Sequence, residues 1–267
     1  NTTSHHADLA TLQEGLTSML LLRGQELTTF HGHANVYGTS RPIDFRLGFK
    51  GRSMSDVMDD VAHEHALLSI NHPGRETGDT CTGCGWDASS TPWDRIEAME
   101  VVNSGVIEGP TAGMPFWYAR LNEGHRITAI GGSDDHGARS PRGHIGTPAT
   151  VVYARELSEA ALLDGIRAGR VYVRTRGPEG PALDLIGSTA QAHVPMGGII
   201  NVAKKGTAVR LMVRAVGAAG QRPEIVRNGE VVATLTVDAD DEELSHTLTM
   251  VPGEWVHVRL RDAAGIT

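Results

Sequence analysis

The chain has 267 residues, enough for one large domain or for a domain of about 150 to 180 residues with a smaller companion. Its 32 acidic and 24 basic side chains give a formal net charge of -8, and no Lys/Arg-rich run occurs. This balance disfavours nucleic acid and anionic membranes as main partners and favours a small-molecule substrate. Since no apolar run approaches the roughly 20 residues of a membrane span, we expect a soluble protein, either cytoplasmic or exported.

Residues 1–176 alternate short apolar runs with helix-like segments, which is typical of repeated β/α units. The expected strands are Met19–Arg23, Ala66–Ile70, Ala98–Val102, Arg126–Ile130, Ala149–Tyr153 and Arg170–Val173. The expected helices are Ser53–His65, Thr111–Asn122 and Ser158–Ala168. Ser53 is a favourable helix N-cap, and apolar residues follow it at helical spacing. The first two thirds of the chain are therefore expected to be an α/β domain.

Residues 178–267 follow a different pattern, in which period-2 or β-rich runs are separated by Gly, Asn-Gly and Asp clusters. The expected strands are Ala208–Val216, Glu224–Val226, Val231–Val237, Leu244–Met250 and Trp255–Leu260. Asn228-Gly229 suits a hairpin turn, because both residues tolerate positive φ. A small β-sandwich-like domain is expected here.

Candidate functional residues lie just beyond four of the expected strands. Loops that leave the carboxyl ends of strands in α/β folds converge on one mouth, so these residues are expected to meet. All are carboxylate, imidazole or amide side chains: Glu26 and His33; His72; Glu100 and Asn103; Asp134 and His136. His31 is either a second imidazole of the first group or an ordinary loop residue.

Nitrogen and oxygen ligands of this kind suit Zn, Mn or Fe. Two such ions about 3.5–4 Å apart can activate a water molecule and stabilise charge on the reacting oxygens of a hydrolysed bond. The pattern therefore predicts a divalent-metal hydrolase.

The same residues resemble a known family, the PHP (polymerase and histidinol phosphatase) domain. The matching runs are Gly24-Gln25-Glu26 with Gly32-His33-Ala34-Asn35, Asn71-His72-Pro73, Glu100-Val101-Val102-Asn103 and Gly132-Ser133-Asp134-Asp135-His136. Thr28-Thr29-Phe30-His31-Gly32-His33, Cys81-Thr82-Gly83-Cys84-Gly85-Trp86 and the trailing β-domain look like its CehA/McbA branch, named for carbaryl hydrolases.

The resemblance implies roles for these residues. Glu26 would be a bridging carboxylate, and His33, His72, Asp134 and His136 would be metal ligands, with Glu26, Asp134 and His136 forming the catalytic core. Glu100 and Asn103 would line the substrate pocket. Two to three ions are implied for an intact parent.

The resemblance also implies a (β/α)7 barrel, which would be incomplete here. The family's first two strands, with their His-x-His and Asp-His ligands, would precede Asn1. The chain is then expected to be an N-terminally truncated fragment, and its activity alone is an open question.

Two further groups of residues have several interpretations. Arg139, Arg142 and His144 follow the Asp134/His136 pair, where they could bind an anionic substrate or protonate a leaving group, or only decorate a loop. Cys81 and Cys84 could form a disulfide, half of a zinc site, or neither.

The sequence therefore predicts metal-dependent hydrolysis of a phosphoester, or of a carbamate or carboxylic ester, by an activated water. The alternative is a non-catalytic binding or scaffold module derived from a truncated or degenerate PHP protein. A less favoured alternative is an amidohydrolase-like barrel, which would require a lysine or a His-x-His at a strand end, and no expected strand exit carries a lysine.

Overall fold

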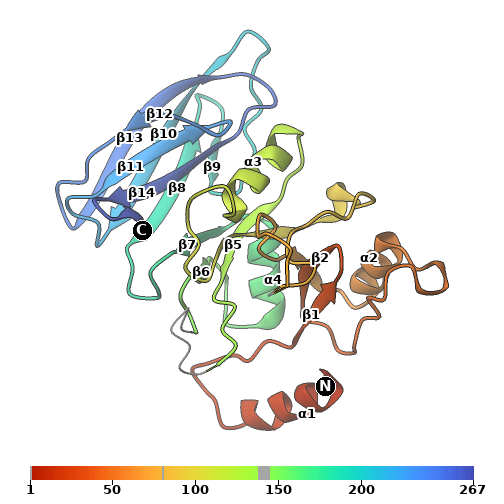
Figure 1. Ribbon diagram of the computed structural model, residues 1–267. Helices are drawn as coiled ribbons and strands as arrows, with labels where there is room; N and C mark the ends of the chain where they lie inside the picture. The colour runs from red at the N-terminus through yellow and green to blue at the C-terminus, as the bar shows by residue number, and fades with distance from the viewer. Residues whose placement is uncertain (1, 80, 138–144) are drawn as a thin grey trace.

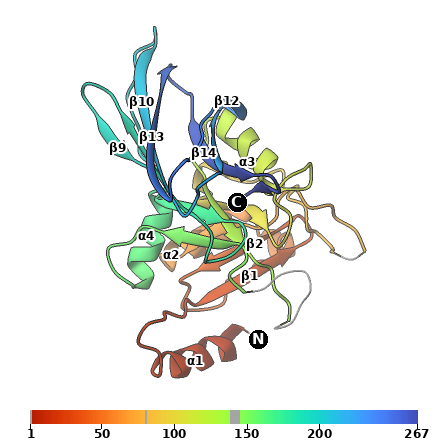
Figure 2. The same cartoon turned by 90° about the vertical axis from the view of Figure 1, so that its left-hand side faces the viewer.

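The computed structural model describes residues 2–79, 81–137 and 145–267. It has a mixed α/β part with a five-stranded sheet, followed by a β-sandwich made of two four-stranded sheets. Figure 1 shows the sandwich, coloured cyan to blue, at the end of the molecule opposite the first helix, coloured red. The turned view in Figure 2 shows the same separation.

The five-stranded sheet has the strand order β1-β2-β3-β4-β5. Its strands are β1 (Gly24–Thr29), β2 (Gly32–Tyr37), β3 (Leu67–Ile70), β4 (Ala98–Asn103) and β5 (Thr128–Gly132). β1, β2 and β3 pair antiparallel, whereas β3, β4 and β5 pair parallel. All residues of β3 and β4 are buried, as expected for parallel strands covered on both faces.

The described helices are short, and none is long and apolar enough to cross a membrane. They are α1 (Thr2–Gln13), α2 (Met54–His63), α3 (Gly113–Asn122) and α4 (Glu159–Arg167), with 3-10 turns at Phe49–Gly51 and Trp93–Arg95. In α2 the Ser53 hydroxyl accepts from the Asp56 N–H, while the Asp56 carboxylate accepts from the Ser53 N–H. This capping box fixes the start of the helix, whose apolar face packs into the core of the sheet.

A separate antiparallel pair, β6 (Ala149–Val152) and β7 (Val171–Arg174), lies beside β5. The Thr150 hydroxyl links the two sheets, because it donates to the carbonyl of Gly131 and accepts from its N–H, at 3.0 and 2.9 Å. α4 connects β6 to β7, and its Leu163 and Ile166 join a second apolar cluster with Leu67 and Ile130.

The sandwich begins at β8, and its core lies between its two sheets. One sheet has the order β13-β10-β8-β9 and the other β12-β11-β14-β15. The first contains β8 (Ala182–Ser188), β9 (His193–Pro195), β10 (Thr207–Val216) and β13 (Asp241–Met250). The second contains β11 (Arg222–Arg227), β12 (Glu230–Thr234), β14 (Val256–Asp262) and β15 (Gly265–Ile266). Alternate residues of β10, from Val209 to Ala215, are buried, which is the period of a strand with one core face.

α3 joins the two parts of the molecule, and both figures show it beside the sandwich. The Trp255 indole N–H donates to the Asn122 side chain at 2.8 Å, and the Tyr118 hydroxyl lies 2.7 Å from His257 Nε2. The Trp117 ring packs edge-on against His257. An aromatic cluster therefore fixes α3 against β14.

The expected incomplete (β/α)7 barrel is wrong. Its strands would all run parallel with a helix after each, but the described residues form four sheets and no closed barrel. The hairpin β1–β2 is the main reason. The expectation places Gly24–Asn35 in the loop that leaves a strand at Met19–Arg23, whereas Gly24–Tyr37 forms two antiparallel strands. The strand expected at Met19–Arg23 is absent, whereas the strands expected near β3 to β7 and the three expected helices are found, with shifted ends.

The packing of His257 makes the stability of the fold depend on pH. Burial lowers the pKa of His257 to about 4, whereas the unfolded chain takes up this proton near 6.5. The stability contributed by the neutral ring is therefore present above pH 6.5 and is lost as the pH falls from 6.5 through 4, by up to about 3 kcal/mol.

We expect His257→Gln to flatten this part of the pH profile. Urea unfolding of the parent and the variant between pH 7.5 and 4 gives the free energy of unfolding of each at every pH. The difference between the two curves reports His257, because the contributions of all other titrating groups cancel. An unchanged slope in the variant would show that His257 titrates alike in the folded and unfolded chains.

Candidate metal centre

The candidate site lies at one edge of the five-stranded sheet. Because β3, β4 and β5 are parallel, their carboxyl ends share this edge. His72 follows β3, Asn103 ends β4 and Asp134 follows β5. Parallel pairing therefore brings these three residues to one edge, although the first and the last of them, His72 and Asp134, are more than 60 positions apart in the sequence.

β1 and β2 reach the same edge from the opposite direction. β2 is antiparallel to β3, so its first residues lie beside the end of β3, and the Asn71 N–H donates to the His33 carbonyl at 3.0 Å. Glu26 on β1 lies beside the same end, with its Oε1 3.4 Å from His33 Nδ1. The Asn71 side chain donates to the same Glu26 oxygen at 3.3 Å.

His33 and His72 are the buried centre of the site. They are only 8% and 4% exposed, and their ring centroids are 5.1 Å apart. The hydrogen bond with the Glu26 carboxylate raises the pKa of His33. The same contact with His33 is the main cause that lowers the pKa of Glu26. Burial lowers the pKa of His72, with the nearby Arg75 adding to the effect. His72 is therefore favoured in the neutral form that a metal ligand requires.

Cys84 supplies a third potential ligand. One ligand atom each from His33, His72 and Cys84 lies within 4.8 Å of the other two, and all three residues are buried, so this group could hold a metal ion. The structure also pairs Cys84 with Cys81 in a disulfide. Since a metal takes a thiolate, Cys84 can complete the set only after this disulfide is reduced.

A chain of polar contacts runs along the edge. Arg75 donates to Asp134 at 2.9 Å and to the Asn103 side-chain oxygen at 2.8 Å. The Asn103 amide donates to Glu100 at 2.8 Å, and Glu100 accepts from the His72 N–H at 3.1 Å. Arg75 is a site residue that was not expected from the sequence, although it lies three residues beyond His72 on the same strand exit.

Glu100 is almost fully buried, and burial raises its pKa to about 7. A Cβ added at Gly132 would lie 2.0 Å from a Glu100 carboxylate oxygen. The glycine that ends β5 is therefore needed to leave room for this carboxyl group. Glu100 holds the backbone and the amide of the neighbouring site residues through its hydrogen bonds.

The backbone is strained at two candidate ligands. His72 has φ 31° and Asp134 has φ 50°, in the left-handed region that non-glycine residues rarely adopt. Such strain costs of order 1–3 kcal/mol and concentrates at functional sites. Hydrogen bonds hold both side chains in place. His72 Nδ1 lies 3.1 Å from the Cys84 carbonyl oxygen, and Asp134 accepts from Arg75.

Other expected site residues lie elsewhere. His136 is exposed, and its Nδ1 is 2.9 Å from the Asp134 carbonyl and 3.4 Å from the Asp134 carboxylate, so it lies next to Asp134 but outside the buried group. His31 is exposed and pairs with Asp87 at 2.9 Å. Arg139, Arg142 and His144 lie outside the described residues.

The residues present suit a metal ion. Among the residues that the structure describes, the Asn71 side-chain oxygen is buried with no hydrogen-bond partner, while the Asn71 side-chain nitrogen donates to Glu26. A buried acceptor without a donor costs about 1–3 kcal/mol, so a bound ion or its water would relieve it. Imidazole nitrogen, thiolate and carboxylate oxygen together match the ligands of zinc more closely than those of Mg²⁺ or Ca²⁺.

Comparison of the chain with protein-family models, with curated proteins and with solved structures gave no match.

Replacing a central histidine should remove metal binding. We expect His72→Ala to weaken Zn²⁺ binding by at least about 100-fold, because one of few protein ligands is lost. His31→Ala is the matched control, since His31 is exposed and lies outside the group. A competition titration with a chromogenic chelator measures both affinities; equal effects of the two variants would contradict the site.

Reduction should strengthen metal binding if Cys84 is a ligand. We expect Cys81→Ser, which leaves a free Cys84 thiol, to bind Zn²⁺ equally with and without reductant, whereas the parent binds more tightly after reduction. Cys84→Ser should bind weakly in both conditions. If Cys84→Ser matches reduced parent protein, the thiolate is not a ligand.

Proposed function

We propose that the chain carries the protein part of a divalent-metal-dependent hydrolase site. The observation that supports this most is the convergence of two buried imidazoles, His33 and His72, with the carboxylates of Glu26 and Asp134 at one sheet edge. These residues are far apart in the sequence. Because burying polar groups is costly, a packing role alone does not explain why they meet at this edge.

His33 and His72 would hold the ion, with Cys84 as a third ligand once its disulfide is reduced. Asp134 and Glu26 would add carboxylate oxygens, and the exposed His136, which lies outside the buried group, would approach from the solvent side. The ion would be Zn, Mn or Fe, which accept imidazole and carboxylate ligands. When bound, such an ion acts as a Lewis acid and lowers the pKa of water.

The chain's own residues have separate tasks in this proposal. Asp134 and Glu26 supply the negative charge that a cation needs. Arg75, which reaches both Asp134 and Asn103, offers a guanidinium to an anionic substrate oxygen. Asn103 lines a small pocket beside His72. The Glu100 carboxylate accepts from the Asn103 amide and from the His72 N–H, and so links the ends of β4 and β3.

The substrate class follows from this polarity. A phosphoester, or a carbamate or carboxylic ester, has an oxygen that becomes more negative during hydrolysis, and Arg75 is placed to stabilise such charge. The short motifs that resemble the PHP family support hydrolysis as the reaction. This support comes from the residue types near the strand ends, because the fold is not the barrel of that family.

A second candidate is a non-catalytic binding or scaffold module, and one contact favours it. Arg75 already neutralises Asp134 and occupies the Asn103 oxygen, so two polar groups of the edge are satisfied without an ion. In that case the network stabilises the loop after β3, and no turnover is expected.

Carboxylate replacement distinguishes the two candidates. With Mn²⁺ or Zn²⁺ added, we expect Asp134→Asn and Glu26→Gln each to lower hydrolysis of p-nitrophenyl phosphate or p-nitrophenyl acetate by at least about 100-fold, since each removes a charge that the ion needs. The control is Asp135→Asn, because the one contact of the Asp135 carboxylate within the described part of the chain is the N–H of Gly137.

Circular dichroism checks that each variant is folded. Turnover that survives in Asp134→Asn would contradict the proposed role of this carboxylate. A parent protein that binds metal but hydrolyses neither substrate would favour the scaffold candidate.

A further inference from the structure

A large cavity lies away from the metal centre, between the five-stranded sheet and the sandwich. Its volume is about 520 Å³, within the range of about 300–1,000 Å³ that small-molecule pockets occupy. It is bounded by α3, by β4, β5 and β7, and by β8 and β14. None of the candidate metal ligands lines it.

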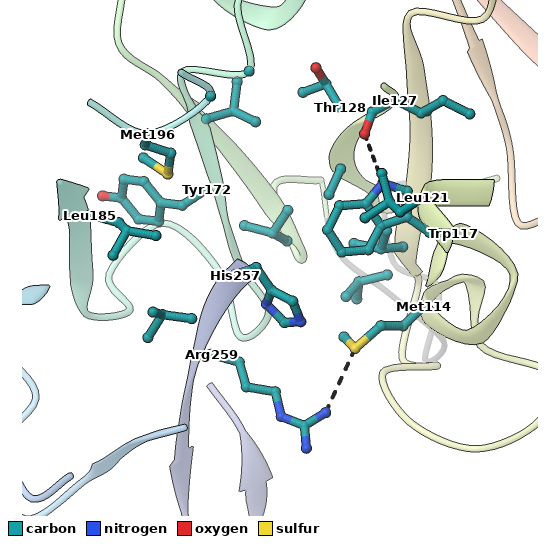
Figure 3. Close-up of a pocket in the computed structure, with 18 of the residues that line it drawn as sticks. Met114, Trp117, Leu121, Ile127, Thr128, Tyr172, Leu185, Met196, His257 and Arg259 are labelled. Carbon is teal, nitrogen blue, oxygen red and sulfur yellow. Dashed lines mark hydrogen bonds between the residues drawn. The ribbon is translucent and has the colours of Figure 1, made fainter. Parts of the chain in front are cut away.

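The cavity walls are mainly apolar and aromatic. Figure 3 shows Met114, Trp117 and Leu121 on one side and Tyr172, Leu185 and Met196 on the other. Flat aromatic and sulfur-containing walls favour a ligand with aromatic rings, which stack or meet them edge-on. The cavity is large enough for two such rings.

Two polar side chains from β14 enter this apolar space. The His257 ring projects between the two walls in Figure 3, and Arg259 extends toward Met114. The Arg259 Nε donates to Glu224 at 2.7 Å, while its Nη1 faces the Met114 sulfur at 3.9 Å. A thioether is a weak acceptor, so a ligand oxygen at this place would form a far stronger bond with the guanidinium.

Three arginines line the cavity, Arg126, Arg167 and Arg259, against two carboxylates, Asp94 and Glu97. Arg167 pairs with Glu97 at 2.6 Å, and Arg126 donates to the Gly197 carbonyl. Arg259 pairs through its Nε with Glu224, which does not line the cavity, and its Nη1 is left facing the Met114 sulfur. The Nη1 of Arg259 is therefore the donor that an anionic ligand would meet.

His257 completes the polar end of the cavity. Its Nε2 lies 2.7 Å from the Tyr118 hydroxyl. Burial raises the pKa of this hydroxyl, and the charge of the nearby Arg259 opposes that rise. Burial lowers the pKa of His257 to about 4, so at neutral pH the ring is uncharged and presents a flat apolar face to a ligand.

We propose that this cavity is a binding site for a small aromatic carboxylate, whose ring lies between Trp117 and Leu185 and whose carboxylate accepts from Arg259. The site goes beyond the proposed hydrolase and needs neither a metal ion nor turnover. Its position between the layers means that such a ligand would contact α3 and the sandwich together.

The test is isothermal titration of the full chain with biphenyl-4-carboxylate and with its neutral match, biphenyl-4-carboxamide. We expect the carboxylate to bind at least about tenfold more tightly than the amide, because a charge-assisted hydrogen bond adds this much. Arg259→Met should remove the preference for the carboxylate, while the affinity for the amide changes less than about twofold.

Arg261→Met is the matched control. Arg261 lies on the same strand and pairs with the same Glu224 as Arg259, at 3.1 Å, but it does not line the cavity. We expect this variant to keep the parent's preference for the carboxylate. Equal losses in the two variants would overturn the assignment of Arg259.

Ala129→Phe tests the cavity itself, because Ala129 lines it and a phenyl ring would fill part of its volume. We expect this variant to bind neither probe, with folding checked by circular dichroism; should it fail to fold, the arginine pair still decides. A parent chain that binds neither probe, or a folded Ala129→Phe that binds both as the parent does, would overturn the proposal.

Discussion

The parallel pairing of β3, β4 and β5 is the constraint on which the candidate site depends. It places three strand ends at one edge, and antiparallel β2 adds His33 through the hydrogen bond from Asn71 to the His33 carbonyl. A shift of one residue in any of these pairings would turn the side chains to the other face of the sheet. The buried imidazoles thus owe their meeting to backbone geometry, which the fully buried β3 and β4 hold in place.

Electrostatics at this edge are balanced within the protein. Buried imidazoles and carboxyl groups are costly unless paired, and here the buried His33 is paired with the more exposed Glu26, and the buried Glu100 with Asn103. The partly exposed Asp134 pairs with Arg75. The same groups that satisfy one another could be shared with a cation. The disulfide of Cys84 adds a chemical condition, since its sulfur becomes a ligand only as a thiolate.

Local patterns predicted much of the structure, and long-range pairing set the rest. The apolar spacing after Ser53 predicted α2, and the period-2 runs predicted β10 and β13. The barrel was wrong because sequence periodicity contains no information on strand direction, so the hairpin from Gly24 to Tyr37 could not be distinguished from a strand and its exit loop. His33 and His72 were found from their places near strand ends. Arg75 was missed, since its partners are 28 and 59 positions away.

Anomalous diffraction from crystals of the reduced chain soaked in Zn²⁺ would locate a bound ion. If His33 and His72 are ligands, we expect an anomalous peak at the sheet edge, about 2.0–2.1 Å from a ring nitrogen of each. A peak that contacts neither histidine, or no peak at this edge at saturating zinc, would contradict a metal centre there.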